Sequence, residues 1–366
     1  MPAAAGLKSL LCRPTRRYRL LKTKDPPITK LEYLTDDPPN ASTPISLLDG
    51  RLLGLGSIYQ RNNFSLPQSP AKEIEVRTGL RGFALNLEEL GRLPRVDLDM
   101  MLECAGNGRA LMDPTPEGTP WALGGASPVK FSGVRLLDAV GELPETVVEL
   151  VFTGSDSGEV EPEGRVNYQF SLTSDLWDRA LLATHLNDRP LPFEHGGPVR
   201  LVVPGQYAMK SVKWLRAIDA VEEPFPGHFV EKYRYFGDNV EPESSPVGEI
   251  VVRSLIADPA DGSTRPEGEI VVRGVAWSAT SGIRSVDVSF DDGENWSPAT
   301  VQPPRSQYGP VTWQEKTSLE PGIYVIAAKA TDSSGAVQPE HQRWNRHGFA
   351  NNAIHRVTVT VTGDSG

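Results

Sequence analysis

One short segment of the chain, LECAGNGR at residues 102–109, combines residue types that could do chemistry. It carries Cys104, one of two cysteines, and a cysteine thiolate is both a nucleophile and a soft metal ligand. The small residues at 105–108 allow a tight turn that a bulky group can approach. Arg109 adds a permanent positive charge whose forked donors suit an oxyanion. The segment alone also fits a second interpretation, in which Cys104 is a small buried side chain and the turn is ordinary.

Other basic side chains lie at the ends of predicted strands or in loops. With Arg109 they are Arg61, His195, Arg200 and Lys213, in a chain whose formal charge is -10. If they face one cavity, they form a pocket for a multiply charged anion such as phosphate or an inorganic oxyanion. If they are scattered, they are ordinary solvated charges, and composition does not decide between the two. For Arg61, two neighbouring asparagines favour a hydrogen-bonding loop over a solvated charge.

The length and composition indicate a globular protein with about two domains. The chain has 366 residues, of which 39% are hydrophobic and 23% charged. Its 34 glycines and 32 prolines favour many turns and strands. Six histidines and two cysteines exclude a zinc-finger array, a disulfide scaffold and a c-type haem. The acidic charge argues against a nucleic-acid partner, and no apolar stretch is long enough to cross a bilayer, so we expect no membrane partner.

The N-terminus resembles an export signal only in part. TRRYRLL, at residues 15–21, contains a pair of arginines, but charged residues and prolines follow it where an export signal has an apolar stretch. We therefore predict that residues 1–30 form an arm with little structure and that the protein is cytoplasmic. In that compartment both cysteines would stay reduced.

The pattern over residues 31–240 predicts an α+β domain that carries the candidate site. We expect strands at 57–60, 75–77, 82–86, 147–156, 199–203 and 210–224. We expect helices at 85–93, 131–143 and 174–186. The chemistry-bearing residues would then lie in the loops that join these elements.

A second domain is predicted over residues 246–366. The polar, acidic and proline-containing stretch at 238–249 is typical of a linker. Beyond it, short alternating runs at regular spacing, with a hairpin signal at DDGENW, are typical of a β-sandwich. We expect Trp277, Trp296 and Tyr324 to fill its core.

LECAGNGR resembles the cysteine motif of the sulfite oxidase family of molybdenum enzymes, and further segments resemble that family's motifs in the same order. They are RNNFSLP at 61–67, HGGPVRLVVPG at 195–205, SVKWL at 211–215, KYRYF at 232–236 and RWNRHGFANNAIHRV at 343–357. Several long motifs in the right order are far more specific than CAGN alone. The resemblance implies a sulfite-oxidase-like molybdopterin-binding domain followed by an immunoglobulin-like β-sandwich that pairs two subunits.

The resemblance also implies roles for individual residues. Cys104 would be the single protein thiolate on molybdenum. The pterin and its phosphate would be held by Asn62, Asn63, Phe64, Ser65, Leu66, Asp156, His195, Arg200, Ser211, Val212 and Lys213. The substrate pocket would be lined by Arg61, Arg109, Trp121, Tyr233 and His347. For Tyr233, the residues alone favour ordinary packing next to Phe236.

Two positions depart from the pattern of the family. Asn63 takes the third place of the arginine loop, where eukaryotic members have a histidine. His347 falls where the family has a further pocket arginine, with Arg346 one step earlier. A histidine can be neutral near neutral pH, so this pocket would carry less positive charge and depend on pH. This departure weakens the inference to sulfite and leaves the inference to molybdenum unchanged.

We therefore expect a homodimeric molybdopterin enzyme, without haem or flavin, that oxidises sulfite to sulfate and passes electrons to a separate acceptor. Two alternatives stay open. One is a related oxotransferase that acts on another oxyanion or reduces S-oxides or N-oxides. The other is a binding module without metal, against which the presence of Cys104, Arg61 and Tyr233 speaks.

Overall fold

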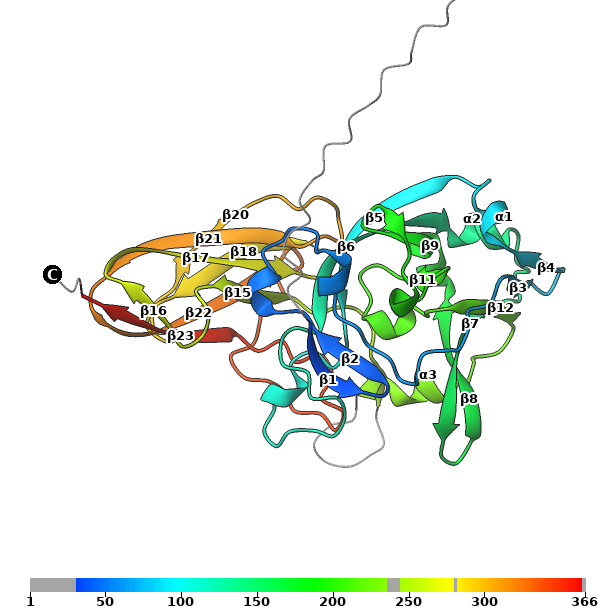
Figure 1. Cartoon of the computed structure of the whole chain (residues 1–366), viewed down its shortest axis with the longest axis horizontal. Helices are drawn as coiled ribbons and strands as arrows, with labels where there is room; N and C mark the ends of the chain where they lie inside the picture. Colours follow the sequence, from blue (N-terminus) through cyan, green and yellow to red (C-terminus); the bar gives the residue numbers. More distant parts are fainter. Residues whose placement is uncertain (1–30, 236–243, 280–281, 364–366) are drawn as a thin grey trace, which may run out of the picture.

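The computed structural model describes residues 31–235, 244–279 and 282–363, which form two strand-rich units (Figure 1). The predicted N-terminal arm at 1–30 lies outside the described residues. The α-helices in the described ranges are only four or five residues long. None of them is long and apolar enough to cross a membrane. The predicted α+β class is confirmed, with β-structure dominant.

The first unit contains two five-stranded sheets. One has the order β10-β9-β6-β5, with β11 also paired to β9, and the other has the order β4-β3-β12-β7-β8. The strands of the first sheet are β5 (Arg95–Glu103), β6 (Ala126–Arg135), β9 (Leu181–Leu186), β10 (Arg189–Pro190) and β11 (Arg200–Val202). Those of the second are β3 (Ile74–Arg77), β4 (Gly82–Leu85), β7 (Glu149–Val160), β8 (Gly164–Thr173) and β12 (Leu215–Val221).

Short elements complete this unit and support its core. They are the hairpin β1 (Glu32–Asp36) and β2 (Pro39–Ser42), and the helices α1 (Leu87–Leu90), α2 (Leu136–Val140) and α3 (His228–Lys232). Side chains of both sheets, such as Phe152 and Leu182, share one buried cluster. The loops at the strand ends therefore extend from a rigid base.

Two predicted helices are wrong over much of their length. In the segment 131–143, residues up to Arg135 belong to β6, and only Leu136–Val140 form the helix α2. The segment 174–186 is a 3₁₀ turn followed by β9. Both strands lie inside the sheet and are buried on both faces, and such a run of consecutive apolar residues cannot be distinguished from a buried helix by periodicity. At Gly133 a Cβ atom would overlap the Leu182 carbonyl oxygen, so only glycine allows β6 to pair with β9 there.

The other predictions for this unit differ in outcome. The strands at 75–77, 82–86, 147–156 and 199–203 and the helix within 85–93 are confirmed, apart from their exact ends. The strand at 210–224 is confirmed from Leu215 onwards. The strand at 57–60 is wrong, because a 3₁₀ turn and a single bridge between Gln60 and Ala41 occupy this segment.

The second unit is the predicted β-sandwich. Its sheets have the orders β15-β17-β21-β20 and β16-β23-β22-β18-β19. The strands of the first are β15 (Arg253–Asp258), β17 (Gly268–Trp277), β20 (Thr300–Val301) and β21 (Val311–Leu319). Those of the second are β16 (Ser263–Pro266), β18 (Ile283–Ser289), β19 (Ser297–Pro298), β22 (Gly322–Asp332) and β23 (His355–Thr362). A short pair, β13 (Arg234–Tyr235) and β14 (Ser245–Pro246), precedes it.

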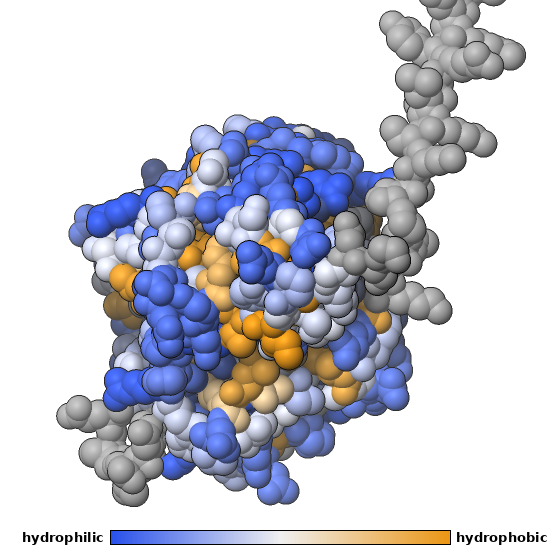
Figure 2. All heavy atoms as spheres, turned by 90° about the vertical axis from the view of Figure 1, so that its left-hand side faces the viewer, coloured by the Kyte–Doolittle hydropathy of each residue, from blue (hydrophilic) through white to orange (hydrophobic). Residues whose placement is uncertain are grey.

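The aromatic core of the sandwich differs from the prediction. Trp313 lies in the core, whereas the predicted Trp277 packs into the cluster of the first unit. Trp296 is half-buried at the surface beneath the Lys329 ammonium, and Tyr324 lies at the margin of the core. Seen from the sandwich end, apolar residues form a band between hydrophilic ones (Figure 2).

Replacement of Trp313 by alanine should lower the free energy of unfolding by about 3–5 kcal/mol, because it removes a large ring from a closed core. Denaturant unfolding followed by circular dichroism measures the loss. The same substitution at half-buried Trp296 should cost about 1 kcal/mol or less. Equal losses at the two positions would contradict this description of the core.

Candidate active site at Cys104

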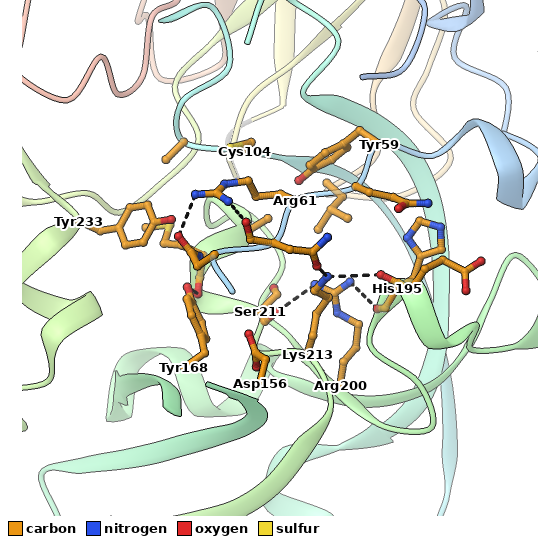
Figure 3. Close-up of a pocket in the computed structure, with 18 residues that line it drawn as sticks. Tyr59, Arg61, Cys104, Asp156, Tyr168, His195, Arg200, Ser211, Lys213 and Tyr233 are labelled. Carbon is orange, nitrogen blue, oxygen red and sulfur yellow. Dashed lines mark hydrogen bonds between the residues drawn. The ribbon is translucent and has the colours of Figure 1, made fainter. Parts of the chain in front are cut away.

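A cavity opens beside Cys104 where loops from both sheets of the first unit meet (Figure 3). It encloses about 670 Å³ of empty space when the open solvent at its mouth is included. Its lining consists of Tyr59, Gln60, Arg61, Asn62, Asn63, Leu102, Cys104, Ala105, Asp156, Tyr168, Glu194, His195, Arg200, Ala208, Met209, Ser211, Lys213 and Tyr233. The segments that supply these residues lie far apart in the sequence.

The Cys104 loop follows directly from the end of β5. The Cys104 amide donates to the Gly125 carbonyl at 2.8 Å, and the Cys104 carbonyl accepts from the Asn107 amide at 3.0 Å. Gly108 has a φ of 89°, a left-handed conformation that favours glycine. The turn that the small residues predict is therefore present, and it places the cysteine side chain at the cavity wall.

The Cys104 thiol is buried, and two positively charged side chains lie near it. Burial raises its pKa, while the nearby guanidinium groups of Arg61 and Arg109 act in the opposite direction. A metal cation has the same sign of effect as these arginines and would favour the thiolate further. The position suits a metal ligand better than an exposed nucleophile.

One end of the cavity concentrates cations. Figure 3 shows Arg200 and Lys213 beside Ser211 and Asp156, at the end away from Cys104. The Arg200 guanidinium donates to the carbonyls of His195 and Ser211, at 2.9 Å each. The Lys213 ammonium donates to the Asn62 side chain and, at 3.3 Å, to the Glu194 carbonyl. Neutral carbonyls fix these cations without cancelling their charge, which leaves them available to an anion.

Burial shifts the pKa values of these groups. It lowers the pKa of Arg200 to about 10 and, with the help of Arg200, lowers that of Lys213 well below its ordinary value. Burial, Lys213 and Arg200 together lower the pKa of His195 to about 3, so its imidazole is neutral at pH 7. A bound anion at this end would stabilise the charged forms and raise these pKa values again.

Asp156 on β7 is the buried carboxylate among these cations. Its Oδ1 atom has no hydrogen-bond partner, although the side chain is only 4% exposed. Burial raises its pKa to about 6, against the opposing effect of Lys213. A buried oxygen without a donor is costly, so this position suits a ligand that presents N–H groups.

The other end of the cavity brings Arg61 and Tyr233 close to Cys104 (Figure 3). The Arg61 guanidinium donates to Asn63 Oδ1 at 2.8 Å and to the Asn62 carbonyl. Tyr233, at the end of α3, is stacked on Phe349 with ring centroids 5.2 Å apart. This end combines the Cys104 thiol with the Arg61 guanidinium and the Tyr233 phenol.

The structure brings four of the five predicted basic side chains to the cavity, together with Asn62, Asn63, Asp156, Ser211 and Tyr233. Arg109 is held behind it, where its guanidinium donates to the carbonyls of His347 and Thr119 at 2.8 and 2.9 Å. Trp121 is fully buried and packs edge-on against Tyr59, and half-buried His347 lies next to Phe349. These three predicted residues lie outside the cavity wall.

Four further predicted residues also lie outside the wall. Phe64 and Val212 belong to the hydrophobic core, and Leu66 is half-buried. Ser65 is exposed and donates to Asp37 at 2.6 Å. Of these, Phe64 and Val212 support neighbouring cavity residues from the core side.

The sequence reasoning missed several residues that line the cavity. Ala105 lies within the cysteine motif, and Tyr59, Gln60 and Glu194 lie one or two residues before the motifs at 61–67 and 195–205, so extending those motifs would have found them. Tyr168 had no such signal, because β8 reaches the cavity only through its pairing with β7. Its hydroxyl donates to the Met209 carbonyl at 2.7 Å.

The neutral state of His195 predicts a pH dependence of stability. Its pKa is about 6.5 unfolded and about 3 folded, so between these values the unfolded chain binds more protons. We expect the free energy of unfolding of the cofactor-free chain to fall on acidification below pH 6.5, by about 1.4 kcal/mol per pH unit from this residue. Urea unfolding at pH 6.5 and 5 measures the slope.

His195→Gln should remove this part of the slope, since glutamine takes up no proton. His341→Gln, at an exposed position of the sandwich, is the matched control for the loss of one imidazole. A slope that is the same in His195→Gln and in the wild type would show that His195 is not held neutral by the fold.

Comparisons with known proteins agree with the two-unit fold. Residues 69–229 match the family model "Oxidoreductase molybdopterin binding domain", and residues 245–362 match "Mo-co oxidoreductase dimerisation domain". The solved structure of the sulfane dehydrogenase SoxCD from Paracoccus pantotrophus aligns with a TM-score of 0.78 at 22% identity, over 94% of this chain and 88% of that one. This likeness concerns the fold.

Curated relatives share more of the sequence. The mitochondrial sulfite oxidase of Homo sapiens is 32% identical over 91% of this chain and 66% of its own length, so the chain spans slightly less than two thirds of that relative. The sulfite oxidase of Gallus gallus is 32% identical over 89% of this chain and 77% of its own length. With the motifs, the fold and the cavity around Cys104, these matches show that the chain belongs to the sulfite oxidase family of molybdenum-dependent oxidoreductases.

Proposed function

We propose that this protein binds a molybdenum cofactor in the cavity beside Cys104 and oxidises sulfite to sulfate. The observation that carries the proposal is the convergence in one cavity of a single thiol with Arg61, Arg200 and Lys213. The relatives named sulfite oxidase support the substrate. Sulfite and sulfate are small anions, so binding one and releasing the other calls for fixed positive charge.

The residues present fit a molybdopterin. At one end Cys104 offers a soft sulfur ligand, and the described residues contain no group of three or more His, Cys, Asp or Glu that could hold a metal by themselves. At the other end Arg200 and Lys213 suit a phosphate. The free Oδ1 atom of Asp156 suits the N–H edge of a pterin ring. Thiol, carboxylate and cations thus match the three chemical parts of one elongated ligand.

When bound, the cofactor supplies the two-electron redox change and the oxygen atom that is transferred. The chain supplies position and field. Arg61 at the wall and Arg109 behind it hold a dianion near Cys104 by charge. Tyr233 presents a phenol hydroxyl at the same end, where it can donate a hydrogen bond to a substrate oxygen. The electrons would then pass to a separate acceptor.

The charge state of His347 supports a second candidate. Burial and then Arg109 and Arg346 lower its pKa, so at pH 7 it adds little positive charge to the substrate end. A pocket with less charge also suits a neutral S-oxide or N-oxide, which the same cofactor would reduce. Steady-state turnover of sulfite against a panel of such oxides separates the two reactions, and loss of sulfite turnover in a His347 variant would assign specificity to this position.

The sandwich supports a proposal about assembly. It matches the dimerisation model, and its end face carries an apolar band within a hydrophilic surface (Figure 2). We propose that two copies of the chain pair through the sandwich. Sedimentation of the full chain measures the mass of the particle.

Molybdenum content tests the first part of the proposal. In a host that makes the cofactor, the wild-type chain should contain about one molybdenum per chain, measured by plasma mass spectrometry. Cys104→Ser should contain less, since a serine hydroxyl is a harder and weaker ligand for this metal. Cys12→Ser is the matched control, and it should keep the wild-type content. A folded wild-type chain free of molybdenum would contradict the proposal and favour a binding module without metal.

Steady-state kinetics test the role of Arg61. Arg61→Met keeps most of the side-chain length and removes the charge, so kcat/KM for sulfite should fall by about 10²–10³-fold. Arg51→Met is the control, because Arg51 is 80% exposed and pairs with Asp49 outside the cavity. Equal kinetics in Arg61→Met and in the wild type would remove Arg61 from the proposed substrate pocket.

A further inference from the structure

We propose that the sandwich positions the Cys104 loop through a buried ion pair between Arg253 and Glu103, and that these two residues are therefore positioning residues of the site. Glu103 is the residue before Cys104, and Arg253 begins β15 of the sandwich. The inference goes beyond the proposed function, on which it rests only for the role of Cys104 as a metal ligand.

The Glu103 carboxylate is fully enclosed and uses both oxygens. Its Oε1 atom lies 3.1 Å from Arg253 Nε and accepts from Asn107 Nδ2 at 3.0 Å. Its Oε2 atom accepts from the Trp277 indole N–H at 2.8 Å. The side chains of Glu103 and Arg253 are 0% and 1% exposed. Two of the three partners, Arg253 and Trp277, belong to the sandwich, and the third belongs to the Cys104 loop.

The backbone of the loop is attached to the sandwich in the same way. Arg253 also donates to the Asn107 carbonyl at 3.4 Å. Asn351 donates to the Gly108 carbonyl at 2.7 Å, and the Ala350 amide donates to the Ala105 carbonyl at 2.8 Å. The carbonyls of Ala105, Asn107 and Gly108 are thus held by groups that the first unit does not supply.

A buried charge pair of this kind fixes one geometry. Each charge has lost its hydration, and Arg253 Nε, although 3.1 Å from Glu103 Oε1, makes no hydrogen bond, so the attraction between the two charges holds this contact and a shift of the loop would leave a charge unpaired. Removal of one partner is therefore much more disruptive than removal of both. An apolar contact of equal area would tolerate small displacements of the loop, which this pair does not.

Hydrogen exchange of the full chain, prepared without cofactor, tests the inference independently of molybdenum. Arg253→Met leaves the Glu103 carboxylate buried and unpaired, so amides of residues 104–109 should exchange at least about tenfold faster. Glu103→Gln combined with Arg253→Met removes both charges and keeps an acceptor for Trp277, and it should return the exchange close to wild type. Arg265→Met breaks the surface pair with Asp258 at 2.7 Å and is the matched control.

Two readouts separate positioning from general stabilisation. Positioning predicts faster exchange in the Cys104 loop with little change in β21 and β22, and molybdenum per folded chain that falls in Arg253→Met and recovers in the double variant. Exchange that rises equally throughout the sandwich, or that the double variant fails to restore, overturns the inference. If Arg253→Met does not fold, Trp277→Phe removes one donor only, and unchanged loop exchange in it overturns the inference. A wild type without molybdenum contradicts the proposed function, while exchange still decides the inference.

Discussion

The concentration of positive charge on buried side chains at one end of the cavity is the constraint on which the rest of the site depends. Burial disfavours the charged form of a basic side chain, and it therefore lowers the pKa values of Lys213 and His195. Backbone dipoles compensate part of the lost hydration, because the Arg200 guanidinium donates hydrogen bonds to two carbonyls and to no carboxylate. The geometry of these cations is fixed in advance, and the nearby carboxylates of Asp156 and Glu194 offset part of their charge without accepting a hydrogen bond from Arg200 or Lys213. This is the arrangement that electrostatic preorganisation requires.

Both units contribute to the position of the site. The cluster that underlies the first unit includes Leu255, Val275 and Trp277 of the sandwich, so no solvated layer separates the units there. The strand β5 is also bound from the sandwich side, since the Met101 amide donates to the Tyr308 carbonyl at 3.0 Å. The cysteine therefore lies at the junction of two cores rather than on a loop of one of them.

The sequence predicted the site better than the elements around it, for a physical reason. Cys104, Arg61 and His195 lie in loops. Their residue types and the adjacent glycines and asparagines can be recognised from a few neighbouring residues of the sequence. The interior strands β6 and β9 leave a pattern that a buried helix shares, and the helix predictions failed there. Tyr168 was missed and Trp277 was assigned to the wrong core, because pairing between distant strands and contact between units decide where they lie.

The buried carboxylate of Glu103 has a consequence for how the chain can change. A unit cut from the chain before residue 244 would keep this charge and lose both of its partners from the sandwich, Arg253 and Trp277. The two units are thus not interchangeable modules, although each has its own sheets. A chimera between relatives would need to transfer residues 103, 253 and 277 as one set, and in evolution a change at one of them would call for a matching change at another.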